Sequence, residues 1–299
     1  MVQALSEGFN YSIVQAPVLC SQHYKLRPSC FARNMGILLW AVLTTMFLYI
    51  IWNISSLARY YLKFTIFIFI SLIFATVPIP LMFLKPRDSR NALLPAWALR
   101  TSAWILGLKY EIKGKENIIK DSGCVVLINH QSALDLIILA QLWPIMDNCT
   151  VISKKEVFYL WPFGLASWLW GTIFIDRLNP EKAQSIVNKT GKTIRHRKAR
   201  VLMFPEGTRS MKEKLLPFKK GAFHLAVASQ CPLQPVIVDQ YTFLGKHRFD
   251  EGSITITILP GIPTAGMTQD DVPMLTEKAY TVMAKFMEER KVEVSKKTM

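Results

Sequence analysis

A histidine and an aspartate lie five residues apart in the segment NHQSALD, directly after the apolar run Cys124–Ile128. On a regular helix five residues turn a side chain by about 140°, so His130 and Asp135 meet only if the histidine precedes the helix. A carboxylate on one imidazole nitrogen fixes the tautomer and leaves the other nitrogen to act as a general base. The pair is suited to removing a proton from an alcohol, although this spacing also occurs without function.

A carboxylate and a guanidinium lie close together in the segment FPEGTRS, at the end of the predicted strand Val201–Phe204. Arginine presents a planar fork of donors that matches a phosphate, and Glu206 is placed to bind a substrate hydroxyl or to hold Arg209. The alternative is a surface turn with an ion pair. The segment GTIFIDR ends another predicted strand, and FKKGAF begins a predicted helix with basic residues, which favour anions.

Other reaction classes lack their usual sequence motifs. There is no GxSxG nucleophile elbow and no GxxxxGK[ST] phosphate loop, which disfavours a serine hydrolase and a nucleotide hydrolase. The five cysteines are scattered without metal-ligand or redox spacing, as expected for a reduced, cytosolic domain. A net charge of +15 favours anionic partners, and the apolar segments described next favour lipid phosphate over nucleic acid.

Two long uncharged runs near the N-terminus predict a membrane helical hairpin. Met35–Trp52 and Phe64–Leu84 are each long enough to cross a hydrocarbon core of roughly 30 Å, and Arg59–Lys63 separates them. We therefore expect a cytosolic segment over residues 1–34, the hairpin over 35–84 and an α/β domain over 85–299. Pro78 and Pro80 allow the second helix to kink or to enter without crossing, and a buried hairpin of a soluble protein is the alternative.

Flanking basic residues place both ends of the hairpin in the cytosol by the positive-inside rule. A third uncharged stretch, Val157–Ile175, contains Pro162, Gly164 and Gly171. We expect it to form an interfacial helix that leads into a buried strand, Thr172–Ile175, with a third membrane span as the alternative.

Alternating β-branched runs and helical patterns predict an α/β domain, a mixed sheet with flanking helices, with reactive loops at the carboxyl ends of strands. The expected strands are Tyr110–Lys113, Cys124–Ile128, Thr172–Ile175, Val201–Phe204, Pro235–Val238 and Ser253–Leu259. The expected helices are Ser132–Leu142, Pro180–His196, Phe218–Ser229 and Val272–Lys291.

Four segments in this order resemble the glycerolipid acyltransferase family. NHQSALD is similar to the family's His-x4-Asp block, GTIFIDR to the second block, FPEGTRS to the third and CPLQPV to the fourth. The resemblance covers about 185 residues and is strongest to the 1-acyl-sn-glycerol-3-phosphate acyltransferase subgroup. Cys231 and Gln234 depart from the fourth block, where relatives are often apolar, and this leaves the acyl chain preference open.

The resemblance implies transfer of an acyl group from acyl-CoA to the sn-2 hydroxyl of lysophosphatidic acid, which forms phosphatidic acid. His130 is then the general base and Asp135 orients it. The residues expected to bind the glycerophosphate or add positive charge are Glu206, Gly207, Thr208, Arg209, Arg177, Lys155 and Lys220. Backbone N–H groups near Ser132 are candidates for stabilising the oxyanion. No metal, cofactor or covalent acyl-enzyme is implied, and acyl-CoA is a co-substrate.

Two other functions are compatible with the sequence. One is acylation of glycerol 3-phosphate or of a different lysophospholipid, and the other is an inactive basic membrane tether. The expected partners are acyl-CoA, lysophosphatidic acid and the lipid bilayer, without nucleic acid. Lys296 and Lys297 resemble a dilysine retrieval signal, which predicts the endoplasmic reticulum membrane with the catalytic domain facing the cytosol.

Overall fold

The computed structural model describes residues 28–176, 190–192 and 194–298. The chain divides into two compact units, residues 1–53 and residues 54–299. The first unit contains most of helix α1 (Pro28–Ile54), which exposes large apolar side chains, among them Leu38, Trp40 and Phe47. The second unit carries every residue of the chemistry considered below.

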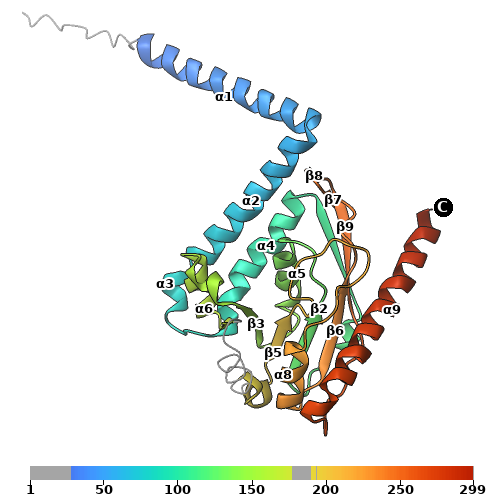
Figure 1. Cartoon of the computed structure of the whole chain (residues 1–299). Coiled ribbons are helices and arrows are strands. Elements are labelled where there is room, and N and C mark those ends of the chain that lie inside the picture. The colour runs from blue at the N-terminus through green and yellow to red at the C-terminus, as the bar shows by residue number, and fades with distance from the viewer. Residues whose placement is uncertain (1–27, 177–189, 193, 299) are drawn as a thin grey trace, which may run out of the picture. The chain divides into compact units, whose positions relative to one another are not determined.

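A seven-stranded sheet forms the centre of the second unit, in the order β1-β9-β6-β2-β5-β3-β4 (Figure 1). The strands β2 to β6 run parallel to one another, whereas β1 and β9 run in the opposite direction because β9 pairs antiparallel with β6. The mixed α/β fold expected from the sequence is therefore confirmed. The strands are β1 (Leu108–Lys113), β2 (Cys124–Ile128), β3 (Cys149–Lys154), β4 (Ile173–Ile175), β5 (Arg200–Met203), β6 (Leu233–Val238) and β9 (Gly252–Ile258), and a short hairpin pairs β7 (Leu244–Gly245) with β8 (Arg248–Phe249).

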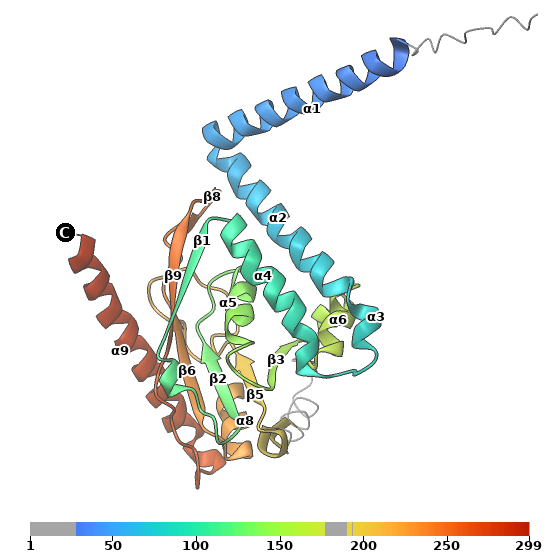
Figure 2. The same ribbon diagram turned by 180° about the vertical axis from the view of Figure 1, so that it is seen from behind.

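Helices cover both faces of the sheet (Figures 1 and 2). Alternate residues of β2 point to opposite sides, so Val126 packs with one apolar core and Val125 with the other. The first core includes residues of α2 (Ser56–Thr76), α4 (Leu93–Ile105) and α5 (Asp135–Leu142), and the second includes residues of α8 (Gly221–Ser229) and α9 (Val272–Thr298). Burial on both faces explains why β2 is apolar at every position.

Helix α2 differs from the second half of the expected hairpin. It begins at Ser56, with the Ser55 hydroxyl accepting the Ala58 N–H, so Arg59–Lys63 is part of the helix and not a connection. It ends at Thr76, before Pro78, and the short helix α3 (Ile79–Met82) follows. Among the described residues, α2 is the one helix long and apolar enough to cross a membrane.

One face of α2 packs against the rest of its unit. Lys63, Phe67 and Ala75 are buried, and the Lys63 ammonium donates to the backbone oxygen of Asp250 at 3.2 Å. The opposite face exposes Phe69 and other large apolar side chains. This helix is thus half covered by protein, and its exposed half is apolar.

The stretch from Val157 to Ile175 is not a continuous helix. The 3-10 helix η3 (Lys155–Tyr159) is followed by the seven-residue helix α6 (Phe163–Leu169), which rises only about 10 Å, and then by β4. Such a helix is too short to span a bilayer. The expected strand Thr172–Ile175 differs in two respects, since β4 begins at Ile173 and is half-buried. It is half-buried because it is the edge strand, with β3 as its sheet neighbour.

Strand β3 (Cys149–Lys154) was not expected from the sequence, and other differences concern helix boundaries. Helix α5 begins at Asp135 and not at Ser132, and α8 begins at Gly221 and not at Phe218. The expected helix Pro180–His196 lies largely outside the described residues, within which 190–192 and 194–197 are helical. Arg177 also lies outside them.

Candidate active site

The carboxyl ends of the parallel strands bring three loops together. His130 follows β2, Glu206 follows β5, and Tyr241 follows β6. Because β5 and β6 are the two hydrogen-bonded neighbours of β2, these loops meet although they are far apart in the sequence. Ligands of open α/β sheets bind at this edge.

The histidine and aspartate are in direct contact. The His130 Nδ1 atom lies 2.6 Å from Asp135 Oδ2, and Asp135 is 2% exposed. The contact is possible because Asp135 opens α5 and the intervening residues form a turn, in which the Ser132 hydroxyl accepts the Leu134 N–H at 2.9 Å. With Nδ1 held by the carboxylate, Nε2 is the nitrogen left for a substrate.

The same carboxylate oxygen also accepts two backbone N–H groups. Gln131 N and Ser132 N donate to Asp135 Oδ2 at 2.7 Å and 3.1 Å. These are N–H groups that the sequence suggested for stabilising the oxyanion, and they are already used by Asp135. Four donors in total, including the Tyr241 hydroxyl, therefore satisfy the two oxygens of this buried carboxylate.

The loop after β5 fixes the histidine from two directions. The Phe204 ring stacks on the imidazole, with ring centroids 4.0 Å apart and planes inclined by 21°. Glu206 is buried, and its Oε1 accepts the His130 N–H at 2.8 Å while Oε2 accepts the Leu216 N–H at 2.9 Å. The Ser210 N–H donates to the His130 backbone oxygen at 2.9 Å. The backbone and the ring plane of His130 are therefore both set by this loop.

The contacts of Glu206 change the role expected for it. Both carboxylate oxygens accept main-chain N–H groups, so Glu206 braces two loops and does not hold Arg209. Burial raises the pKa of the Glu206 carboxyl above its ordinary value, and the N–H groups of His130 and Leu216 oppose that change.

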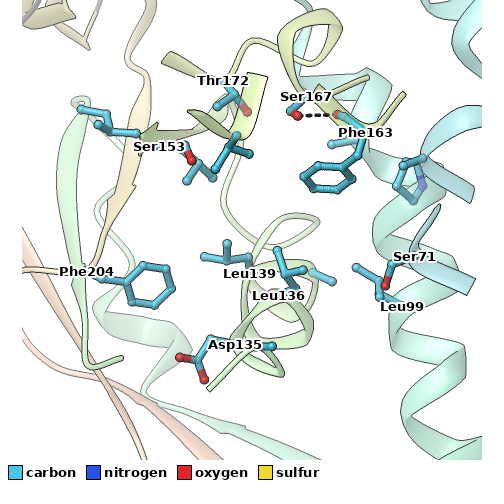
Figure 3. A pocket seen from close by; sticks show the side chains of 18 of the residues that line it. Ser71, Leu99, Asp135, Leu136, Leu139, Ser153, Phe163, Ser167, Thr172 and Phe204 are labelled. Atoms are coloured by element: carbon cyan, nitrogen blue, oxygen red, sulfur yellow. Dashed lines mark hydrogen bonds between the residues drawn. The ribbon is translucent and has the colours of Figure 1, made fainter. Parts of the chain in front are cut away.

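A cavity of about 700 Å³ opens beside the pair (Figure 3). His130, Asp135 and Phe204 line one part of it, and apolar side chains of α4 and α5, such as Leu99, Leu136 and Leu139, line the interior. Ser71 of α2, Phe163 and Ser167 of α6 and Thr172 also line it (Figure 3). Its size falls within the roughly 300–1,000 Å³ typical of ligand sites. A chemically active polar group thus borders a largely apolar chamber.

Basic side chains border the same cavity, but not all the expected ones. Gly207, Thr208 and Arg209 line it, as does Lys154, which the sequence reading passed over. Lys155 instead pairs with Asp176 at 3.6 Å. Lys220 is exposed at the start of α8, outside this lining, whereas the Lys219 side chain lies against Gly207. Among the described residues, Arg209 and Lys154 are therefore the cations best placed to meet an anion at the cavity.

A metal centre is not formed by the part of the chain that the structure describes, because no three His, Cys, Asp or Glu side chains gather there. The chemistry available at the cavity is that of a carboxylate-oriented imidazole, with nearby cations and an apolar chamber.

Comparison with known proteins places this arrangement in a family. A model of the family described as Acyltransferase matches residues 109–239, which include the loops after β2 and β5 and the whole of β6. The human 1-acyl-sn-glycerol-3-phosphate acyltransferase alpha is 35% identical over 242 residues, which cover 80% of this chain and 85% of the relative. A Caenorhabditis elegans protein named putative 1-acyl-sn-glycerol-3-phosphate acyltransferase acl-2 is 33% identical over 251 residues, covering 79% of this chain and 84% of that relative.

A solved structure shows a similar fold. The 1-acyl-sn-glycerophosphate (LPA) acyltransferase PlsC from Thermotoga maritima matches with a TM-score of 0.59 at 21% identity, covering 77% of this chain and 97% of that chain. On the sequence relationship to the human and nematode proteins, this chain belongs to the 1-acyl-sn-glycerol-3-phosphate acyltransferase family.

Proposed function

We propose that this protein transfers a fatty acyl group from acyl-CoA to the sn-2 hydroxyl of lysophosphatidic acid, giving phosphatidic acid and free CoA. The observation that carries the proposal is the contact between His130 and Asp135 beside a largely apolar cavity bordered by cations. The names of the relatives, which specify an acylglycerol phosphate acceptor, support it.

In the proposed reaction His130 Nε2 takes the proton of the acceptor hydroxyl while its oxygen attacks the thioester carbonyl carbon. The C–O bond forms, and the tetrahedral intermediate then collapses with cleavage of the C–S bond. The imidazolium returns the proton to the departing CoA thiolate, so the base is regenerated. Asp135 keeps the Nδ1–H of His130 in place and stabilises the positive charge that forms on the ring.

Arg209 and Lys154 are proposed to bind the acceptor phosphate, since both border the cavity near His130. A guanidinium fork suits the phosphate oxygens, and the lysine adds a point charge. The acyl chain is proposed to enter the apolar interior beside Leu136 and Leu139, where each buried methylene contributes about 0.8 kcal/mol. Binding both substrates in this way brings the hydroxyl and the thioester together.

The protein is proposed to work at a lipid surface. Exposed large apolar side chains lie on α2 (Phe69), on α4 (Trp97 and Trp104) and near α6 (Tyr159 and Trp161). Exposed aromatic residues of this kind are typical of membrane interfaces, where their amphipathic rings meet the headgroups. An acyl chamber reached from such a surface receives lipid substrates without passage through water.

The decisive experiment measures CoA thiol release by the purified protein in lipid vesicles with one acyl-CoA and three acceptors. We expect release with lysophosphatidic acid in preference to glycerol 3-phosphate and lysophosphatidylcholine. His130→Ala should lower that rate by roughly 10²- to 10⁴-fold, the usual contribution of a general base. His224→Ala is the matched control, since that imidazole contacts Gln269 outside the cavity.

Each other outcome contradicts part of the proposal. Activity retained by His130→Ala excludes the general base role. A preference for glycerol 3-phosphate or lysophosphatidylcholine means that lysophosphatidic acid is not the acceptor. An absence of CoA release with every acceptor favours an inactive tether.

Location in the endoplasmic reticulum membrane, with the catalytic domain in the cytosol, stays a prediction. It is tested by cell fractionation together with glycosylation at Asn10, which lies in an N-glycosylation sequon. Modification of Asn10 places the N-terminus in the lumen and contradicts the predicted orientation.

A further inference from the structure

The buried Asp135 carboxylate has a partner in the loop after β6. Its Oδ2 atom faces His130 and the two backbone N–H groups, whereas its Oδ1 accepts the Tyr241 hydroxyl at 2.6 Å. Tyr241 is 1% exposed and is 106 residues away in the sequence. No chemistry proposed above uses this hydroxyl.

Backbone contacts hold Tyr241 firmly at that place. The Tyr241 N–H donates to the Gln131 side-chain oxygen at 3.0 Å. The Gln131 amide nitrogen in turn donates to the backbone oxygens of Val238 and Asp239. Asn129 adds a reciprocal pair of hydrogen bonds with the Val238 backbone. The loop after β6 is thus joined to the loop that carries His130, and the hydroxyl position is fixed by both.

We propose that Tyr241 is a positioning residue, which holds the Asp135 carboxylate so that Oδ2 faces the imidazole and which moderates the negative charge on that oxygen. This proposal rests on the proposed role of His130 as the general base. Tyr241 acts through Asp135 and does not contact the substrate.

The direction of its effect follows from electrostatics. A donor on Oδ1 draws negative charge away from Oδ2, so removing the hydroxyl concentrates charge next to the imidazole. The three donors on Oδ2 remain in the Tyr241→Phe variant. The charged imidazolium is then favoured, and a higher pH is needed to obtain the neutral base.

Tyr241 remains a donor over any practical assay range. Burial and the neighbouring Asp135 charge raise the pKa of the Tyr241 phenol well above its ordinary value. A titration of Tyr241 itself therefore does not complicate the pH profile.

The test compares Tyr241→Phe with Tyr110→Phe in the full-length protein in lipid vesicles. Tyr110 is a matched control, because its hydroxyl is also buried and lies near the Asp135 charge, yet has no hydrogen-bond partner among the residues that the structure describes. The measurements are kcat, KM for both substrates, thermal unfolding, and kcat/KM between about pH 5.5 and pH 9.

For Tyr241→Phe we expect kcat to fall about tenfold, the effect of losing one hydrogen bond to a charged group, with KM values changed less than about twofold. The acidic limb of the kcat/KM profile should move to higher pH by about half a unit or more. Tyr110→Phe should keep the wild-type profile.

Two results overturn the inference. The first is a Tyr241→Phe enzyme with wild-type kcat and an unshifted acidic limb. The second is a loss of kcat that follows a lower unfolding temperature while the acidic limb stays unshifted, because a purely structural role predicts that pattern.

A double variant separates this inference from the base role of His130. In a His130→Ala background, Tyr241→Phe should change the residual rate by less than about twofold, since the group it positions is gone. A further tenfold loss there contradicts the proposal. An active His130→Ala enzyme contradicts the base role, whereas an inactive His130→Ala beside a normal Tyr241→Phe contradicts the positioning role alone.

Discussion

Replacing Glu206 by glutamine tests whether this carboxylate braces the site or binds the acceptor. Its two oxygens accept the N–H groups of His130 and Leu216 at 2.8 Å and 2.9 Å, and the residue is 4% exposed. Glutamine has nearly the same shape but one carbonyl oxygen. In Glu206→Gln, one of the two backbone N–H groups must face an amide NH2 group, and two donors cannot bond each other.

The magnitude follows from those two contacts. A hydrogen bond to a charged group contributes about 1.5–3 kcal/mol, and a buried N–H group without a partner costs about 1–3 kcal/mol. Burial already disfavours the ionised carboxyl, as the raised pKa of Glu206 indicates, and the neutral amide avoids that penalty. We expect a net loss of about 2 kcal/mol in the free energy of unfolding, which lowers Tm by about 4–8 °C in a domain of this size.

The effect on catalysis should appear in kcat. Displacement of the His130 backbone moves the imidazole away from the reacting hydroxyl, so kcat should fall at least about tenfold. KM for lysophosphatidic acid should change less than about threefold, because both Glu206 oxygens are engaged with the main chain. CoA release against acceptor concentration separates the two parameters. Glu213→Gln is the control, since that exposed carboxylate pairs with Lys291 at the surface.

A raised KM with unchanged kcat and Tm in Glu206→Gln would refute this reasoning. That result would mean that the carboxylate binds the acceptor directly.

Three further predictions concern the cavity and the cysteines. Lys154→Met should raise KM for lysophosphatidic acid about tenfold or more in the CoA-release assay, because Lys154 lines the cavity. Lys155→Met should change that KM less than about threefold, because Lys155 pairs with Asp176. Leu139→Trp should slow transfer from an 18-carbon acyl-CoA at least about tenfold more than from an 8-carbon one, because the larger indole fills the apolar interior of the cavity. Equal slowing of both donors contradicts the placement of the acyl chain in that interior. Burial raises the pKa of Cys124 to about 12, so at pH 8 less of this thiol is ionised in the folded protein than in the unfolded chain. Mass spectrometry should therefore find Cys124 unmodified by iodoacetamide until guanidinium is added. Rapid labelling of the native protein contradicts this prediction.

Local sequence was sufficient to predict the scaffold of the site. The run Cys124–Ile128 is apolar at every position because both faces of β2 are covered, and its bounds were predicted without error. The contact between His130 and Asp135 needed only that the helix begin late, and it begins at Asp135. The contact depends on residues within one short turn, where steric and hydrogen-bonding rules are strong, and the burial of β2 on both faces is visible in the sequence as an uninterrupted apolar run.

The side chains that act on this pair from a distance were not predictable in the same way. Phe204 stacks on His130 because β5 lies beside β2, and nothing in FPEGTRS distinguishes a stacked phenylalanine from an ordinary core residue. The sequence also offers Lys154 and Lys155 as equals. The chain leaves β3 after Lys154 and turns into η3 at Lys155, so one residue decides which cation borders the cavity. Strand β3 was itself missed, and with it this distinction.

The arrangement of strands explains why several separate sequence segments act as one site. Because β5, β2 and β6 are adjacent and parallel, the loops that follow them must meet. The loops after β5 and β6 are each joined to the His130 loop by a hydrogen bond: Glu206 accepts the His130 N–H, and Gln131 accepts the Tyr241 N–H. Groups that share one such network do not contribute independently. Losses from Glu206→Gln and Tyr241→Phe should therefore be smaller in combination than the product of the two, because both act through the placement of one imidazole relative to one carboxylate.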